Sequence, residues 1–164
     1  MKNIYLIGMP GCGKSTIGKV ISREINMDFV DLDDYIEKMT SKTIPELFEM
    51  GEKHFREAES NALLKVSRMQ NTIVSTGGGI IVTDKNAEVM KNTGIVIFIN
   101  TSPDKILGNS ALEGRPLLKD KNKIFDLYEK RYNLYTLEAQ YVVDNEGSIN
   151  ECVQKILDII KTEK

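Results

Sequence analysis

One segment of the chain reads Gly8-Met9-Pro10-Gly11-Cys12-Gly13-Lys14-Ser15-Thr16, which matches the pattern G-x-x-x-x-G-K-[ST] of a phosphate-binding loop. An apolar, β-branched run at 4–7 precedes this segment, and a helical pattern over 14–25 follows it. Between a strand and a helix, glycines let backbone N–H groups turn around a phosphate, and the helix N-terminus adds partial positive charge. The sequence therefore predicts a nucleotide site formed by Gly11, Cys12, Gly13, Lys14, Ser15 and Thr16.

Lys14 and Ser15 carry the chemistry of this loop. We expect the Lys14 ammonium to reach the β- and γ-phosphate oxygens and the Ser15 hydroxyl to ligate Mg²⁺. Cys12 occupies a variable position of the pattern, where a small residue fits. The loop alone does not separate a small-molecule kinase from a switch GTPase, but the chain has no N-K-x-D motif for guanine. Small-molecule kinases instead carry an acceptor-binding segment and a lid with an arginine, and this chain has candidates for both.

Short apolar runs alternate with helical patterns along the whole chain. The runs lie at 4–7, 29–32, 72–75, 95–99 and 141–143. The helical patterns lie at 14–25, 34–39, 44–67, 85–92, 124–137 and 150–160. This alternation predicts parallel strands joined by right-handed crossovers, hence a single α/β domain over 1–164 with helices on both faces of the sheet. Ligands of such sheets bind beyond the carboxyl ends of the strands.

Composition excludes several classes of protein. The 164 residues suffice for one domain, and a net charge of −2 argues against nucleic acid or an anionic membrane as the main partner. Neither a membrane-spanning run nor a signal peptide is recognisable. Two cysteines, Cys12 and Cys152, form no zinc pattern or disulfide framework and fit a reducing cytoplasm. Because His54 is the only histidine, a Ser-His-Asp hydrolase is excluded. We expect a monomer.

Two carboxylates, Asp31 and Asp33, close the second apolar run. Alternation along a strand would place both on the same side, at the sheet edge near the phosphate loop. There they suit the holding of Mg²⁺ through water and the orientation or deprotonation of an attacking hydroxyl. The alternative is that Asp33 or Asp34 merely caps the next helix.

Arginine is scarce in this chain, since five of its 22 basic residues are arginines. Arg56, Arg115 and Arg131 fall in segments that can reach the strand ends, whereas Arg23 and Arg68 are expected at the surface. The planar guanidinium suits a carboxylate or a phosphate better than an ammonium does. Arg56 lies three residues before Glu59 on a predicted helix, so an ordinary surface ion pair is the alternative there.

Two further segments follow apolar runs. Thr76-Gly77-Gly78-Gly79 carries no acid where many phosphate-loop enzymes have a metal-binding Asp, so Mg²⁺ would depend on Ser15 and Asp31. The glycines admit close approach of a substrate, or else form a merely flexible turn. Gly114-Arg115-Pro116-Leu117-Leu118 lies in a polar stretch at 109–123. This stretch is either a lid that brings Arg115 to the transferring phosphate or a solvated loop.

Taken together, these residues resemble the shikimate kinase family through almost the whole chain. The elements stand in family order: 8–16, Asp31-Leu32-Asp33, Phe55-Arg56-x-x-Glu59, Thr76-Gly77-Gly78-Gly79, Arg115-Pro116-Leu117-Leu118, and Arg131 followed by Tyr135. The resemblance implies a three-layer phosphate-loop kinase fold with a five-stranded parallel sheet. It also implies an acceptor-binding segment over about 32–60 and a lid over about 109–121.

The resemblance also implies an activity, the phosphorylation of the 3-hydroxyl of shikimate by MgATP in aromatic amino-acid biosynthesis. Shikimate would be contacted by Asp33, Arg56, Gly78, Gly79 and Arg131. ATP phosphates would be contacted by Lys14 and Arg115, and Asp31 would hold Mg²⁺ through water. We expect catalysis to depend on Lys14, Asp33 and Arg115.

The chain departs from the family at one place. An arginine that stacks on adenine usually stands shortly before the lid arginine, and here Leu107-Gly108-Asn109 occupies that stretch. Asn145 is a candidate for an adenine contact instead. Two alternatives stay open: a kinase of another small hydroxy acid such as gluconate, and a nucleotide-binding regulatory module without turnover. The presence of both Lys14 and Asp33 favours an enzyme.

Overall fold

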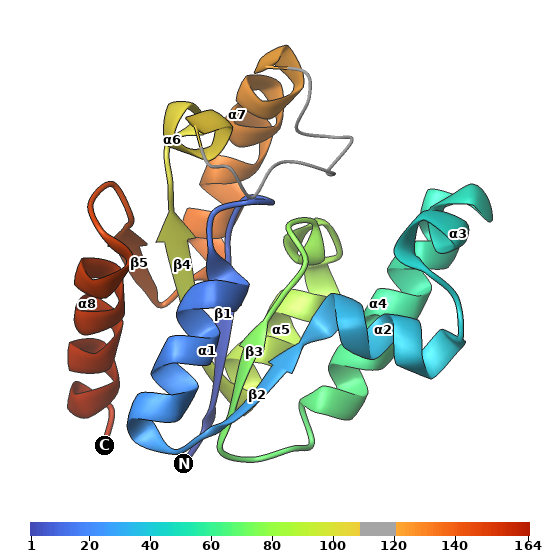
Figure 1. The fold of residues 1–164 in the computed structure, drawn as a ribbon. Coiled ribbons are helices and arrows are strands. Elements are labelled where there is room, and N and C mark those ends of the chain that lie inside the picture. Colours follow the sequence, from blue (N-terminus) through green and yellow to red (C-terminus); the bar gives the residue numbers. More distant parts are fainter. Residues whose placement is uncertain (109–120) are drawn as a thin grey trace.

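The computed structural model describes residues 1–108 and 121–164, across which five parallel strands form one sheet in the order β2-β3-β1-β4-β5 (Figure 1). The strands are β1 (Asn3–Ile7), β2 (Asp28–Asp31), β3 (Thr72–Ser75), β4 (Gly94–Asn100) and β5 (Tyr141–Asp144). All four strand pairs are parallel, with Ile4 opposite Ile73 on one side of β1 and Ile95 on the other. The predicted α/β class with a parallel sheet is confirmed.

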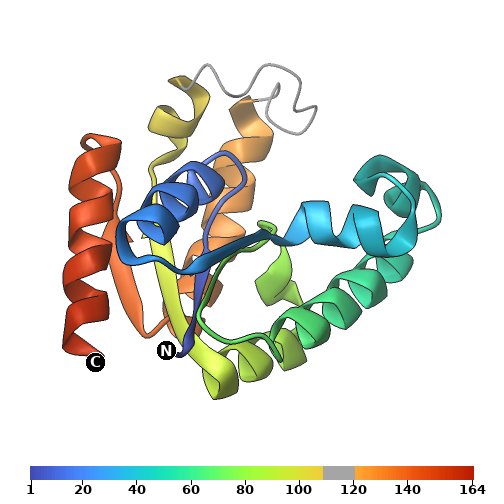
Figure 2. The same cartoon turned by 60° about the horizontal axis from the view of Figure 1, so that its bottom comes forward.

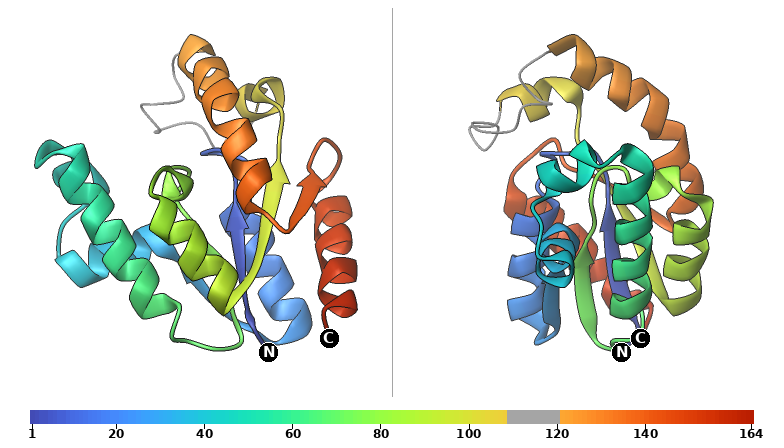
Figure 3. Two further views of the ribbon diagram at one scale, coloured as in Figure 1. Left: turned by 180° about the vertical axis from the view of Figure 1, so that it is seen from behind. Right: turned by 90° about the vertical axis from the view of Figure 1, so that its right-hand side faces the viewer.

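Helices cover both faces of the sheet. Figure 3 shows α1 (Lys14–Ile25) and α8 (Ile149–Thr162) on one face and α5 (Asp84–Thr93) and α7 (Lys121–Glu138) on the other. Every residue of β1 is therefore buried, as are all of β4 except its last. This double coverage explains why these strands are apolar throughout rather than alternating. It leaves the strand ends as the part of the sheet open to a ligand.

Three helices form an arm beyond the β2 edge of the sheet (Figure 2). They are α2 (Leu32–Thr40), α3 (Ile44–Glu49) and α4 (Glu52–Val66). The prediction of one continuous helix over 44–67 is wrong, because α3 ends before Gly51 and α4 begins after it. Gly51 has a φ of 115°, a conformation that a helix interior does not contain and that favours glycine.

The junction of β2 and α2 also differs from the prediction. β2 ends at Asp31, so Asp33 lies in the first turn of α2 rather than on the strand. Asp31 itself caps α2, because its side chain accepts hydrogen bonds from the N–H groups of Asp33 and Asp34. Both earlier interpretations are therefore corrected: the alternation argument does not apply to Asp33, and neither Asp33 nor Asp34 is the helix cap.

Two short elements follow the carboxyl ends of β3 and β4. The 3₁₀ turn η1 (Ile80–Val82) follows the three glycines after β3, and α6 (Pro103–Gly108) follows β4. Neither was predicted from the sequence. The predicted lid, with Arg115, lies outside the described residues. No helix within the described ranges is long and apolar enough to cross a membrane.

Candidate active site

A cavity of about 490 Å³ extends along the carboxyl ends of the strands. It reaches from Asp31 and Asp33, beside one edge strand, to Asn145 and Gly147, which follow the strand at the other edge. Of the predicted site residues, it is lined by Gly11, Cys12, Gly13, Lys14, Ser15, Thr16, Asp31, Asp33 and Gly78. The structure thus brings the loop and both aspartates to one cavity.

The phosphate loop is held by close backbone contacts. Gly8 has a φ of 148°, and a Cβ there would lie 2.6 Å from the Ile99 carbonyl oxygen, so only glycine fits. Lys14 is 7% exposed, and its Nζ donates to the carbonyl oxygens of Gly8 and Met9, each at 2.8 Å. The lysine is therefore oriented by its own loop at the wall of the cavity.

A group of oxygen donors lies at the start of α1. Ser15 Oγ donates to Asp31 Oδ2 at 2.6 Å and lies 2.9 Å from Ser75 Oγ. The described residues contain no cluster of three or more His, Cys, Asp or Glu side chains that could hold a metal ion. Mg²⁺ usually retains several waters and takes few protein oxygens, so this donor set fits it. Sequence reasoning missed Ser75, although it ends the strand beside the phosphate loop.

Each of the three glycines after β3 approaches a different side chain. A Cβ on Gly77 would lie 3.1 Å from Asp33 Oδ1 and 3.2 Å from Glu59 Oε2. A Cβ on Gly78 would lie 2.6 Å from Pro10 Cδ, and one on Gly79 would lie 2.4 Å from Arg56 Nη2. The segment is thus packed between the phosphate loop and the arm, and the alternative of a merely flexible turn is wrong.

Glu59 is a fully buried carboxylate on α4. Its Oε1 accepts from Arg56 Nη1 at 2.9 Å. Burial raises the pKa of Glu59, the Arg56 charge and hydrogen bond lower it, Asp33 raises it and Arg131 lowers it. Because these four groups influence one another, they form one electrostatic unit. The alternative of an ordinary surface ion pair is wrong for Arg56 and Glu59.

The Arg56–Glu59 pair leaves hydrogen-bonding capacity unused. Among the described residues, Arg56 Nε and Glu59 Oε2 are buried without a hydrogen-bond partner. The Arg56 guanidinium also lies 5.1 Å from the ring centroid of Phe55 and 5.9 Å from that of Phe48. Native structures rarely leave such atoms unpaired, so they mark a place where a polar group completes the bonding.

Arg131 reaches the same region from α7. One helical turn later, Tyr135 is fully buried, and its hydroxyl donates to the Gly78 carbonyl oxygen at 2.5 Å. Burial raises the pKa of Tyr135, whereas the charge and hydrogen bond of Arg131 lower it. The guanidinium of Arg131 therefore lies beside the glycine segment, together with the Arg56–Glu59 pair.

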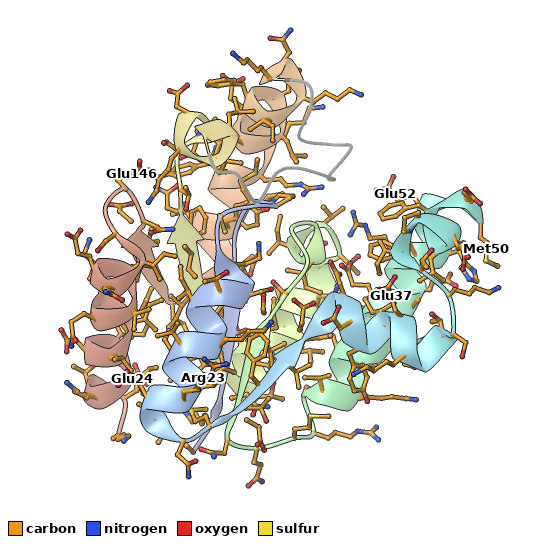
Figure 4. All side chains as sticks on the ribbon, in the orientation of Figure 1. Arg23, Glu24, Glu37, Met50, Glu52 and Glu146 are labelled. Atoms are coloured by element: carbon orange, nitrogen blue, oxygen red, sulfur yellow. The ribbon has the colours of Figure 1, made fainter. Side chains whose placement is uncertain are left out.

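The remaining residues considered lie either at the surface or at the β5 end of the cavity. Arg23, labelled on α1 in Figure 4, and Arg68 are exposed as expected. Asn145 lines the cavity, but its Nδ2 donates to Cys12 O and Thr101 Oγ1, so this part of the amide is engaged within the protein. Lys105, which sequence reasoning missed, lines the cavity beside it. No motif pointed to Lys105.

Comparison with known proteins assigns the family. Residues 10–161 match the family model of shikimate kinase. A shikimate kinase of Clostridium botulinum is 48% identical over 98% of each chain, and one of Clostridium beijerinckii is 46% identical over 98% of this chain and 96% of its own. The chain belongs to the shikimate kinase family.

The solved structures agree with this assignment. A structure described as shikimate kinase from Acinetobacter baumannii in complex with shikimate has a TM-score of 0.92 and 35% identity. It covers all of this chain and 95% of its own. The family match includes every described residue that lines the cavity, from Pro10 to Ile149. The structural similarity confirms the phosphate-loop kinase architecture that the sequence predicts.

The pKa of Glu59 generates a prediction about stability. Because its pKa in the folded protein is above 4.5, stability from this carboxyl is present below that pH and is lost as the pH rises. Glu59→Gln cannot titrate. The free energy of unfolding of the variant minus that of the wild type should therefore increase from pH 4.5 to pH 7, measured by urea unfolding.

Glu52→Gln is the matched control. The Glu52 side chain also faces Arg56, at 3.6 Å, but is 69% exposed, and Figure 4 labels it at the outer end of the arm. The free energy of unfolding of Glu52→Gln minus that of the wild type should stay nearly constant over the same pH range. A Glu59→Gln difference that decreases with pH would mean that the arginines lower the Glu59 pKa more than burial and Asp33 raise it.

Proposed function

We propose that this protein transfers the γ-phosphoryl group of ATP to the 3-hydroxyl of shikimate, giving shikimate 3-phosphate and ADP in aromatic amino-acid biosynthesis. The observation that carries the proposal is the convergence of Arg56, Glu59 and Asp33 on the glycine segment. Asp33, Gly77 and Gly78 line the cavity that also holds the phosphate loop, whereas Arg56 and Glu59 lie behind this lining. Membership of the shikimate kinase family supports the same activity.

On the acceptor side, Arg56 and Arg131 hold the carboxylate of shikimate. Glu59 orients Arg56 through Nη1, so the remaining guanidinium donors stay directed at the ligand. Gly78 and Gly79 admit the acceptor close to the backbone because neither has a side chain. The segment over about 32–60, within a single domain over 1–164, is thus the acceptor-binding part of the enzyme.

On the transfer side, Asp33 orients the 3-hydroxyl and accepts its proton. A bond forms between that oxygen and the γ-phosphorus, and the bond to the β-phosphate oxygen of ADP breaks. Lys14 stabilises the charge that develops between the β- and γ-phosphates. Arg115, which lies outside the described residues, is assigned to the transferring group by its place in the family pattern.

Mg²⁺ is the cofactor that fits the oxygen donors at the start of α1. Ser15 would ligate it directly and Asp31 through water. When bound, it neutralises charge on the phosphates. Ser75 keeps the Ser15 hydroxyl in place, since their oxygens are 2.9 Å apart.

We infer that the enzyme acts as a monomer in the cytoplasm, without nucleic acid or membrane partners. Cys12 and Cys152 are both free and buried, which fits a reducing compartment. Size-exclusion chromatography with light scattering measures the oligomeric state.

The carboxylate contact gives the decisive test of substrate class. ADP formation should depend on shikimate and be weak with quinate and gluconate. The methyl ester of shikimate should be a poor substrate, because truncating one partner of a buried charge pair costs about 2–5 kcal/mol, roughly a 30- to 4,000-fold change. Arg131→Lys should also lower kcat/KM for shikimate, while ATP affinity stays within about threefold. Equal rates with the ester and the acid would contradict the carboxylate contact.

Gly79→Ala tests the placement of Arg56. The new Cβ would lie 2.4–2.5 Å from both terminal guanidinium nitrogens, so the flexible end of Arg56 must move while the backbone stays in place. KM for shikimate should rise about ten- to a hundredfold with little change for ATP. Gly108→Ala is the control, because a Cβ there meets no atom of the described residues within 4 Å. An unchanged KM for shikimate in Gly79→Ala would remove Arg56 from the acceptor site.

Lys14→Met tests the phosphate loop. The charge is needed chiefly as negative charge moves toward the bridging oxygen, so kcat should fall by about a thousandfold, more than nucleotide affinity falls. Steady-state kinetics and calorimetry with ADP separate these two effects. Lys19→Met, an exposed position on the same helix, should leave both unchanged. A normal kcat in folded Lys14→Met would contradict the assignment.

A further inference from the structure

Lys105, on α6, joins two loops at the β5 end of the cavity. Its ammonium group donates to the carbonyl oxygen of Asn145, to Asn145 Oδ1 at 3.3 Å and to the carbonyl oxygen of Gly147 at 2.8 Å. An ammonium has three donors, and all three are accounted for by these contacts. The side chain therefore fixes the loop between β5 and α8 and has no donor left for a phosphate.

Two side chains of this loop, Glu146 and Asn145, also bond to neighbouring segments. Glu146, labelled beside α6 in Figure 4, accepts from Ser102 N at 2.7 Å and from Ser102 Oγ at 3.0 Å. Asn145 Nδ2 donates to Cys12 O in the phosphate loop at 3.1 Å and to Thr101 Oγ1 at 3.3 Å. We call Thr101, Ser102, Lys105, Asn145, Glu146 and Gly147 the clamp.

The clamp lies at one end of the site already described. Lys105, Asn145, Gly147 and Ile149 line the same cavity as the phosphate loop. The acceptor groups are beside β2 and β3, the phosphate loop follows β1, and the clamp follows β4 and β5. A nucleotide whose phosphates lay on the phosphate loop, with its γ-phosphate toward the acceptor groups, would therefore have its nucleoside on the side of the clamp.

We propose that Lys105 is a positioning residue for the nucleotide, acting through the loop at 145–147 rather than by contact with the phosphates. This inference rests on the proposed function, since it concerns how ATP is held. The ammonium group stabilises a loop whose backbone carbonyls would otherwise repel one another. Asn145 Nδ2 also donates to Cys12 O of the phosphate loop at 3.1 Å, but the phosphate loop has its own support from Lys14, so the main effect of Lys105 is on the loop at 145–147.

Lys105→Met removes the three donors while keeping the length of the side chain. The dissociation constant for ADP, measured by calorimetry without acceptor, should rise about ten- to a hundredfold, as expected for losing hydrogen bonds to a charged group. KM for ATP should rise similarly. KM for shikimate, and kcat at saturating ATP, should stay within about twofold, because the acceptor groups are at the opposite end of the cavity.

Lys105→Arg distinguishes positioning from direct charge attraction. Arginine keeps the charge, but its planar guanidinium cannot place donors on the same three oxygens. Positioning predicts that the loss of ADP affinity persists in Lys105→Arg, and that inorganic tripolyphosphate binding changes less than ADP binding in both variants. Restored ADP affinity in Lys105→Arg, or equal losses for ADP and tripolyphosphate, would overturn the proposal.

Controls separate this inference from stability and from the proposed function. Lys91→Met removes a lysine paired with Glu138 outside the cavity and should leave ADP binding unchanged. If Lys105→Met does not fold, Glu146→Gln at an exposed position should weaken ADP binding in the same direction, and no change there overturns the proposal. Absence of shikimate-dependent ADP formation by the wild type would contradict the proposed function, whereas the ADP binding measurements test the clamp alone.

Discussion

Backbone from β1 approaches backbone from β4 so closely at Gly8 that a Cβ would lie 2.6 Å from the Ile99 carbonyl oxygen. This approach lets the chain leave the covered sheet and turn directly into α1. The turn then places Lys14 at the cavity wall and Ser15 against Asp31. Since helices cover both faces of the sheet, the site lies beyond the carboxyl ends of the strands. The close approach at Gly8 therefore sets the position of the phosphate loop, to which the other parts of the site are adjacent.

The acceptor side is organised around the buried carboxylate of Glu59. Desolvation and the nearby charge of Asp33 together outweigh what Arg56 and Arg131 offset, because the net shift of the Glu59 pKa is upward. Glu59 thus orients Arg56 without saturating it, since Nε has no hydrogen-bond partner among residues 1–108 and 121–164 and Nη2 lies 3.6 Å from exposed Glu52. An arginine that is oriented yet has free donors is what two-pronged binding of a carboxylate requires.

Sequence reasoning succeeded where a property is local and failed where it depends on distant contacts. The phosphate loop was predictable because its glycines act through their own backbone. The β2–α2 boundary was not, because apolar Leu32 continues the strand pattern although it begins a helix. Glu59 was noticed as a partner of Arg56, but its burial depends on the packing of the glycine segment. Lys105 contacts Asn145 and Gly147, which lie 40 and 42 positions later in the chain, and no sequence motif indicates such distant contacts.

The choice between lysine and arginine differs between the two ends of the cavity. Lys14 and Lys105 both direct an ammonium at backbone carbonyl oxygens that converge from neighbouring loop residues, an arrangement that suits a compact group of three donors. Arg56 and Arg131 lie at the acceptor end, where a planar guanidinium matches a planar carboxylate. The arginine that the family usually has near 107–109 is replaced here by Leu107-Gly108-Asn109. In this chain, order at the nucleotide end therefore comes from loops that a lysine holds together.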